Sequence, residues 1–170
     1  MWKKVILTGI VSVSALFGGE LIKNNTGFIG IAGGGAKVTE KWHGLYSFKV
    51  GYYYYISNPL KVSNRLYLSV DGIAGVKEGV NEVGLHFDGI FNYSPIFKPY
   101  AGVVVADAIR YQNGDDVPKN FLTYGGEVGL ILPLGNHWEV EAGGRLVNAT
   151  KSISWKRSLK EYFVGFNYSF

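Results

Sequence analysis

From Gly27 to the end of the chain, apolar side chains alternate with polar or small ones, and turn-forming residues interrupt the alternation at intervals. A period of two residues is typical of a β-strand with two different faces. Eight such segments fit into the sequence, and each is long enough to cross a bilayer when tilted. The predicted strands are residues 27–37, 45–56, 65–76, 82–93, 99–111, 122–132, 137–147 and 160–170.

The two faces of the predicted strands differ in the size of their side chains. In the last segment, bulky residues such as Tyr162, Val164 and Phe166 alternate with smaller or polar ones such as Gly165 and Asn167. The second, fourth and seventh segments show the same division, with glycine and formal charges sharing one face. A soluble antiparallel sandwich also has two-faced strands, so the pattern by itself leaves that alternative open.

The width of a small barrel favours the membrane interpretation. The lumen of an eight-stranded barrel is only wide enough for side chains, so an interior of glycine and charge fits, whereas a ring of Tyr and Phe does not. The aromatic face is therefore expected to meet lipid. The predicted fold class is all-β, an eight-stranded antiparallel up-and-down transmembrane β-barrel. Its outside should expose Phe87, Phe91, Trp138, Phe166 and Tyr168.

The connections between the predicted strands are of two kinds. The second, fourth and sixth contain Pro59, Pro95 and Pro133 in compact turns, whereas the others are polar and charged. With an even number of strands, both chain ends lie on one side, which predicts that the proline turns are periplasmic and the polar connections extracellular. Irregular alternation at residues 103–105 suggests a β-bulge in the fifth strand.

The N-terminus has the pattern of a secretory signal peptide. Lys3 and Lys4 precede an apolar stretch, Val5 to Phe17, that is too short to span a bilayer comfortably. Cleavage is expected between Ala15 and Gly19, and an uncleaved membrane anchor is the alternative. The predicted division is a signal peptide over 1–19 and an outer-membrane β-barrel over 20–170.

Composition supports an exported sheet protein. The 24 Gly, 12 Tyr and 10 Phe suit tightly packed strands with aromatic girdles, and the absence of Cys agrees with export without disulfides. The chain has 17 basic and 13 acidic residues, and two of the basic ones lie in the predicted signal peptide. The remaining balance is no signature of nucleic-acid binding.

The end of the chain resembles a known assembly signal. The last six residues, Gly165 to Phe170, are similar to the C-terminal signal of outer-membrane barrels, with apolar residues at alternate positions and an aromatic end. The resemblance assigns this role to Gly165, Tyr168 and Phe170, and it implies that the barrel-assembly machinery is a partner. Phe163 departs from the pattern, which usually has a polar residue there.

Internal stretches point to the same group of proteins. Residues 98–103, 124–130 and 134–145 resemble the small outer-membrane β-barrel superfamily that includes OmpA-type transmembrane domains and opacity-like surface proteins. The resemblance implies an integral protein of the bacterial outer membrane, in contact with its lipid and lipopolysaccharide. Members include adhesins, membrane-stabilising proteins, small pores and enzymes, so the fold does not fix the function. We expect a non-enzymatic role in envelope structure or surface interaction.

Charged side chains collect on the predicted inner face. Charges in a narrow lumen must be paired or hydrated, so a structural polar network is the main interpretation. The surplus of acids over bases also allows a narrow channel for protons or cations. Arg145 is expected to pair with at least one of Glu127, Glu139 or Glu141. The predicted lumen residues are Lys49, Arg65, Asp71, His86, Asp88, Asp107, Glu127, Glu139, Glu141 and Arg145.

A lipid A modifying enzyme is the second alternative, because such enzymes also use eight-stranded barrels. His86 with Asp88, and His137 with Glu139, have the spacing that puts two side chains on one strand face. No His-x-Ser arrangement of the deacylase kind is present. We therefore predict no catalytic residues. The three scattered histidines predict neither a metal site nor a cofactor.

The last polar connection has a cationic and aromatic composition. It contains Lys151, Trp155, Lys156 and Arg157. Such residues at an outer rim are able to hold lipopolysaccharide phosphates or an extracellular partner, which the sequence does not identify. A solvated loop with an interfacial anchor is the simpler interpretation.

Overall fold

The computed structural model describes residues 26–38, 41–55, 61–74, 78–112, 119–150 and 158–170. The predicted signal peptide, with its cleavage site, therefore lies outside the described residues. Among the described residues, no helix has the length and apolar character needed to cross a membrane. The strands are β1 (Thr26–Val38), β2 (Lys41–Tyr55), β3 (Val62–Ala74), β4 (Glu78–Phe91), β5 (Lys98–Gln112), β6 (Lys119–Pro133), β7 (Trp138–Ala149) and β8 (Ser158–Ser169).

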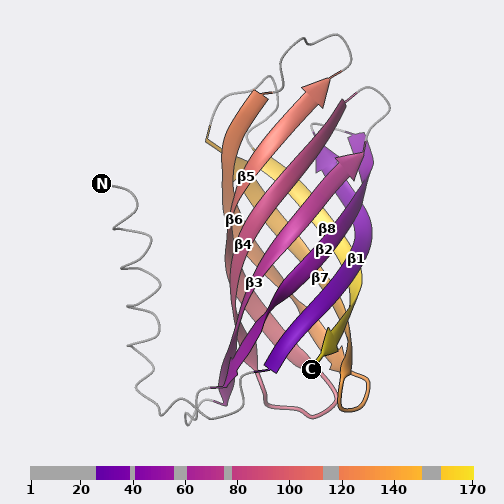
Figure 1. Ribbon diagram of the computed structural model, residues 1–170, viewed down its shortest axis with the longest axis vertical. Helices are drawn as coiled ribbons and strands as arrows, with labels where there is room; N and C mark the ends of the chain where they lie inside the picture. Colours follow the sequence, from indigo (N-terminus) through magenta and orange to yellow (C-terminus); the bar gives the residue numbers. More distant parts are fainter. Residues whose placement is uncertain (1–25, 39–40, 56–60, 75–77, 113–118, 151–157) are drawn as a thin grey trace, which may run out of the picture.

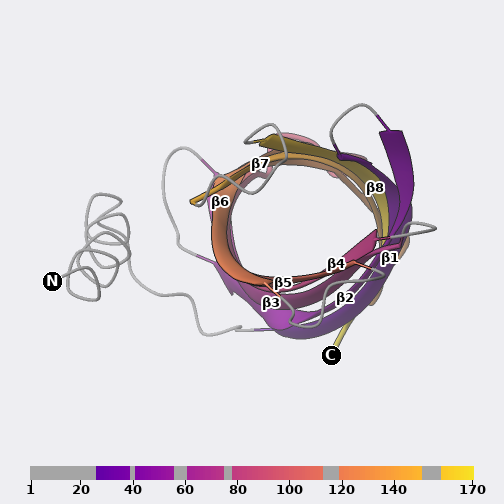
Figure 2. The same cartoon turned by 90° about the horizontal axis from the view of Figure 1, so that it is seen from above.

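These strands form one closed antiparallel barrel in which every strand pairs with its neighbours in sequence (Figures 1 and 2). The barrel closes where β1 pairs with β8, from Phe28 opposite Ser169 to Lys37 opposite Lys160. The predicted fold class is therefore confirmed. The bulge expected in the fifth strand is wrong, because the register of β5 runs without a skip against both β4 and β6.

The two ends of the barrel differ as the sequence indicates. The first residue of β1 and the C-terminus lie at one end, the lower end in Figure 1, together with the last residues of β2, β4 and β6. Pro95 lies in the connection between β4 and β5, whereas Pro133 is the last residue of β6 rather than part of the following turn. That turn contains Gly135 with a φ of 92°, a conformation that favours glycine. Pro59 is outside the described residues.

The outer wall of the barrel is an apolar belt. Trp138 and Phe166 are about half exposed, at 53% and 51%, and Phe91 is exposed as well. Tyr168 also points outward but is partly covered, because its ring lies 4.9 Å from that of Trp138. Phe87 is also partly covered. The expected outward face is therefore confirmed, and bulky side chains form most of it.

The interior is layered along the barrel axis. Near the lower end, a buried aromatic and aliphatic cluster, here called the lower layer, contains Phe28, Tyr53, Tyr67, Ile90, Tyr100 and Ile131. Towards the opposite end, a second cluster, the upper layer, contains Leu45, Ile73, Phe121, Val147, Leu159 and Phe163 among others. The expectation that aromatic rings would be excluded from the lumen is wrong. A barrel of this width accommodates them because glycine and alanine occupy many facing positions.

Candidate functional site in the barrel lumen

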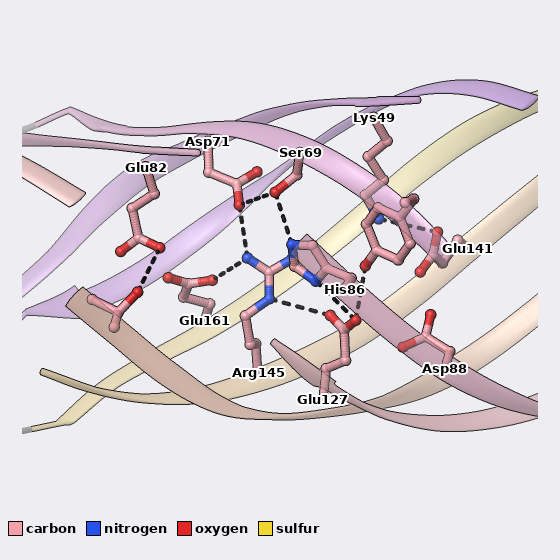
Figure 3. Close-up of polar contacts among 12 residues, drawn as sticks. Lys49, Ser69, Asp71, Glu82, His86, Asp88, Glu127, Glu141, Arg145 and Glu161 are labelled. Carbon is pink, nitrogen blue, oxygen red and sulfur yellow. Dashed lines mark hydrogen bonds and ion pairs between the residues drawn. The ribbon is translucent and has the colours of Figure 1, made fainter. Parts of the chain in front are cut away.

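Between the two apolar layers, the inner wall holds a band of buried charges (Figure 3). Inward side chains alternate with outward ones along every strand, so residues far apart in sequence meet across the lumen. The structure brings together eight of the ten residues that the sequence places there: Lys49, Arg65, Asp71, His86, Asp88, Glu127, Glu141 and Arg145.

Arg65 is the centre of the lower half of this band. Its Nη2 lies 2.6 Å from Asp88 Oδ2 and 2.9 Å from Glu141 Oε1. Lys49 Nζ also pairs with Glu141, at 3.1 Å, and the side-chain amide of Asn167 donates to the same carboxylate. All these side chains are buried. Glu141 is therefore saturated with donors from three other strands and ties β2, β3 and β8 to β7.

Arg145 is the centre of the upper half. Its guanidinium contacts Asp71 Oδ2 at 2.8 Å, Glu161 Oε2 at 3.1 Å and Glu127 Oε2 at 3.2 Å. The expected pair with Glu127 is therefore present, because Arg145 and Glu127 are direct cross-strand partners. Glu141 pairs elsewhere. A single arginine thus bridges β3, β6 and β8, and charge-assisted bonds of this kind are strong when buried.

Glu139 lies on the inner face as expected but outside the charged band, whereas Asp107 departs from the expected lumen set. Glu139 is half-buried at the lower end of β7, where it accepts a hydrogen bond from Tyr53. Asp107 is exposed on the outer face, which corrects its predicted inward position. The reason is the unbroken register of β5, which points Ala106 and Ala108 inward and hence the residue between them outward.

His86 connects Ser69 on β3 to Glu127 on β6 within the upper half of the band. Ser69 Oγ lies 2.8 Å from His86 Nε2, and His86 Nδ1 lies 3.0 Å from Glu127 Oε1. The Tyr67 ring stacks on the imidazole at 4.2 Å, and its hydroxyl donates to Glu127. The order of Ser69, His86 and Glu127 is that of a hydrolase triad.

This triad-like chain is closed off from the surroundings. Ser69 and His86 are 1% and 0% exposed, so no substrate reaches the serine oxygen in this structure. Ser69 Oγ also lies 2.9 Å from Asp71 Oδ2 and donates to it. A hydroxyl that hydrogen-bonds a carboxylate in a packed lumen extends the polar network. The geometry therefore supports a structural role for these three residues.

Aromatic rings cover the cations from both layers. The Arg65 guanidinium carbon lies 4.8 Å from the ring centres of both Tyr67 and Tyr100. Lys49 Nζ lies 4.4 Å from the ring centre of Phe163, and the Arg145 guanidinium faces the same ring at 5.5 Å. These distances are in the range of cation–π attraction. Phe163, the departure from the C-terminal pattern, therefore has a packing role inside the barrel.

Sequence reasoning missed several members of the band. Glu82 and Glu161 are buried acids, and Ser69 is the hydroxyl that contacts His86. The period of two would have found each of them, since Glu82 shares a face with His86 and Glu161 shares one with Phe163. The described lumen then buries six acidic residues against four basic ones. No group of His, Cys, Asp and Glu in the described part of the chain is arranged to hold a metal ion.

The other residues predicted from the sequence lie away from the lumen band. The cationic connection with Lys151, Trp155, Lys156 and Arg157 is outside the described residues. In the C-terminal segment, Gly165 is buried and faces inward. Phe170 is exposed beyond the end of β8, and its backbone N–H donates to Gly27 O. The last residue therefore extends the pairing of β8 with β1 at the lower end.

Comparison with known proteins places this architecture in a class. No protein-family model and no curated protein sequence matches the chain. Among solved structures, neisserial surface protein A superposes with a TM-score of 0.65 and 16% identity over 86% of this chain and 97% of that one. The N-terminal β-barrel domain of Pseudomonas aeruginosa OprF gives 0.59 and 16% over 84% and 97%. Ail, the attachment invasion locus protein of Yersinia pestis, gives 0.56 and 13% over 86% and 97%.

All three of these proteins are small eight-stranded outer-membrane barrels. The chain has the fold of this class: a closed antiparallel barrel of eight strands with an apolar outer wall. At these identities, the likeness establishes the fold alone.

Proposed function

We propose that this protein is an integral outer-membrane β-barrel that serves envelope structure or surface interaction and has no enzymatic activity. The observation that carries the proposal is the contrast between the two faces of its wall. The outer face is apolar and aromatic, as lipid requires, whereas the lumen is filled by ion pairs between two apolar layers. A lumen filled in this way is consistent with a rigid barrel that anchors the protein in the membrane.

The orientation follows from the barrel ends. The lower end, with the first residue of β1, the C-terminus and the connection that contains Pro95, faces the periplasm, and the upper end faces outward. Residues 1–19 are a cleaved Sec-type signal peptide in this proposal. The similarity to neisserial surface protein A and to Ail, an attachment protein by its name, supports a surface role at the upper end.

Cell fractionation tests the location, and the mass of the purified chain tests the signal. We expect the protein in the outer-membrane fraction, with faster gel migration before boiling than after, and a mature N-terminus between residues 16 and 20. A chain found in the soluble or inner-membrane fraction, or one that keeps its first residues, would contradict the proposal. Comparison with a deletion strain then separates the two roles. Weaker attachment of the deletion strain to host surfaces would indicate a surface role, and greater sensitivity to detergent would indicate a structural one.

A narrow channel remains the second candidate because of the acid surplus. One carboxylate oxygen in each of Asp71, Glu82 and Glu161 is buried without a hydrogen-bond partner among the described residues. The apolar layers on both sides of the charged band argue against an open path for ions. Purified protein in planar bilayers is expected to give no conductance steps, and reproducible steps would favour the channel.

A further inference from the structure

The connection between β4 and β5, at the lower end of the barrel in Figure 1, exposes apolar side chains. Residues 92–97 have the sequence Asn-Tyr-Ser-Pro-Ile-Phe, without a formal charge. Ile96 is 74% exposed and Tyr93 is 65% exposed, and Phe97 is exposed as well. Apolar side chains gathered in this way are unfavourable in water, and contiguous patches of them mark binding surfaces.

The connection between β6 and β7, at the same end, has a similar character. Residues 134–137 are Leu-Gly-Asn-His, and Leu134 is exposed. Leu134 N–H donates to Trp138 O at 2.7 Å, which keeps this leucine beside an exposed indole. Because Lys98 pairs with Ile131, the residues before Lys98 lie beside those that follow Ile131. The patch, here called the lower rim, consists of Tyr93, Ile96, Phe97 and Leu134.

The lower rim continues the apolar outer wall. Phe91 is exposed at the end of β4, and its ring stacks on that of Tyr93 with the centres 6.3 Å apart and the planes at 12°. Trp138 and Tyr168 form a second aromatic pair at the lower ends of β7 and β8. Trp and Tyr side chains prefer the boundary between lipid headgroups and acyl chains. The lower rim therefore begins where the lipid-facing wall reaches this boundary.

The first connection satisfies part of its polar groups within the protein. Asn92 N–H donates to Lys61 O at 2.8 Å, and the Asn92 side-chain amide donates to Ser63 Oγ at 2.9 Å. Ile96 N–H donates to Ser94 Oγ at 3.2 Å. Unsatisfied backbone groups are what excludes an irregular segment from lipid. These bonds hold the connection against the start of β3 and lower the cost of a shallow insertion.

From these observations, we propose that the lower rim inserts into the phospholipid leaflet. Ile96, Phe97 and Leu134 lie among the first methylene groups of the acyl chains, and the Tyr93 hydroxyl lies among the headgroups. Lipid is favoured over a protein partner because the patch continues the lipid-facing wall, and because neither connection has the charges that protein interfaces use for steering. The choice of leaflet rests on the proposed function, since it requires the lower end to face the periplasm.

The experiment measures the lipid exposure of single nitroxide labels. The chain has no Cys, so each cysteine variant carries one label. The folded mature protein is placed in vesicles of phosphatidylethanolamine and phosphatidylglycerol, without any other protein. Power saturation compares collisions of the label with oxygen, which is enriched in lipid, and with a water-soluble nickel chelate. I96C should give an oxygen-to-nickel ratio close to that of L130C, because Leu130 is exposed on the apolar wall.

K61C is the matched control at the same end of the barrel. Lys61 is exposed and charged, and its carbonyl contacts the β4–β5 connection, so a label there should give the low ratio of an aqueous site. L134C tests the neighbouring connection and should give a high ratio, like I96C. Gel migration before and after boiling shows that each variant is folded.

The outcomes separate this inference from the proposed function. A ratio at I96C or L134C as low as that at K61C would overturn the lipid site in favour of a soluble periplasmic partner. Dipolar broadening at I96C that disappears on dilution with unlabelled protein would overturn it in favour of a second copy of the chain. A high ratio at L130C with a low one at I96C refutes this inference alone. A low ratio at L130C refutes the integral barrel and hence the proposed function.

Discussion

Replacement of Arg145 by methionine tests whether the lumen network stabilises the barrel. Methionine keeps much of the side-chain volume but removes the charge and every hydrogen bond. Three carboxylates, those of Asp71, Glu127 and Glu161, then lose a partner that now lies 2.8 to 3.2 Å away. Removing one member of a buried ion pair costs about 3–5 kcal/mol, chiefly because the other charge stays buried and unpaired. We expect R145M to lower the free energy of unfolding by this amount.

The measurement is reversible urea unfolding in lipid vesicles, followed by tryptophan fluorescence and by gel migration. L146M is the matched control, because Leu146 is the next residue but is exposed on the outer wall. L146M should change the free energy of unfolding by no more than about 0.5 kcal/mol. R145K should be intermediate, since one ammonium group does not reproduce the fork of a guanidinium.

A double variant separates charge balance from lost packing. Adding E161Q to R145M removes one of the stranded charges, so part of the lost stability should return. If the free energy of unfolding of R145M lies within about 1 kcal/mol of the wild-type value, the network does not stabilise the barrel, and the ion pairs only fill space.

Four further results are expected. E141Q should destabilise the barrel by about 3 kcal/mol in the same unfolding assay, because its two cationic partners lose their shared anion, and an unchanged midpoint would contradict this. G34A should cost about 1–3 kcal/mol, since an added Cβ meets backbone atoms of β8, whereas G33A has room and should be nearly neutral. F170A should reduce the heat-modifiable fraction in cells, and full assembly would argue against the C-terminal signal. Bilayer recordings of wild-type protein should show no conductance steps.

The period of two made most of the fold and much of the lumen predictable from the sequence. It assigns Lys49 and His86 to the inner face because each lies between two bulky outward residues, and Arg145 because it shares a strand face with Glu141. Applied to the upper ends of the strands, it also includes Glu82 and Glu161. Both residues lie within the predicted strands 82–93 and 160–170, at the first and the second position, although the observed strands begin earlier, at Glu78 and Ser158.

The partners across the lumen were not predictable. Which carboxylate meets Arg65 depends on the stagger between strands around the whole barrel, and a single sequence does not specify it. The inward aromatic rings were excluded by an argument from width alone. Tyr67 and Phe163 fit inside because their flat rings pack directly against polar side chains. The Tyr67 ring stacks on the His86 imidazole, and the Phe163 ring contacts the Lys49 ammonium group. Asp107 was misassigned because valines on both faces of β5 hide the alternation.

The seam between β1 and β8 constrains the order of events during folding. Its pairs, such as Phe28 with Ser169, join the first strand to the last, so the barrel closes only after β8 is available. Until then, β1 presents an open edge whose backbone groups have no partner in hydrocarbon, at a cost of several kcal/mol for each unsatisfied group. A nascent or truncated chain that lacks β8 is therefore not a smaller barrel but an insertion-incompetent sheet. Cells must hold such chains away from the membrane, or degrade them, until the last strand arrives.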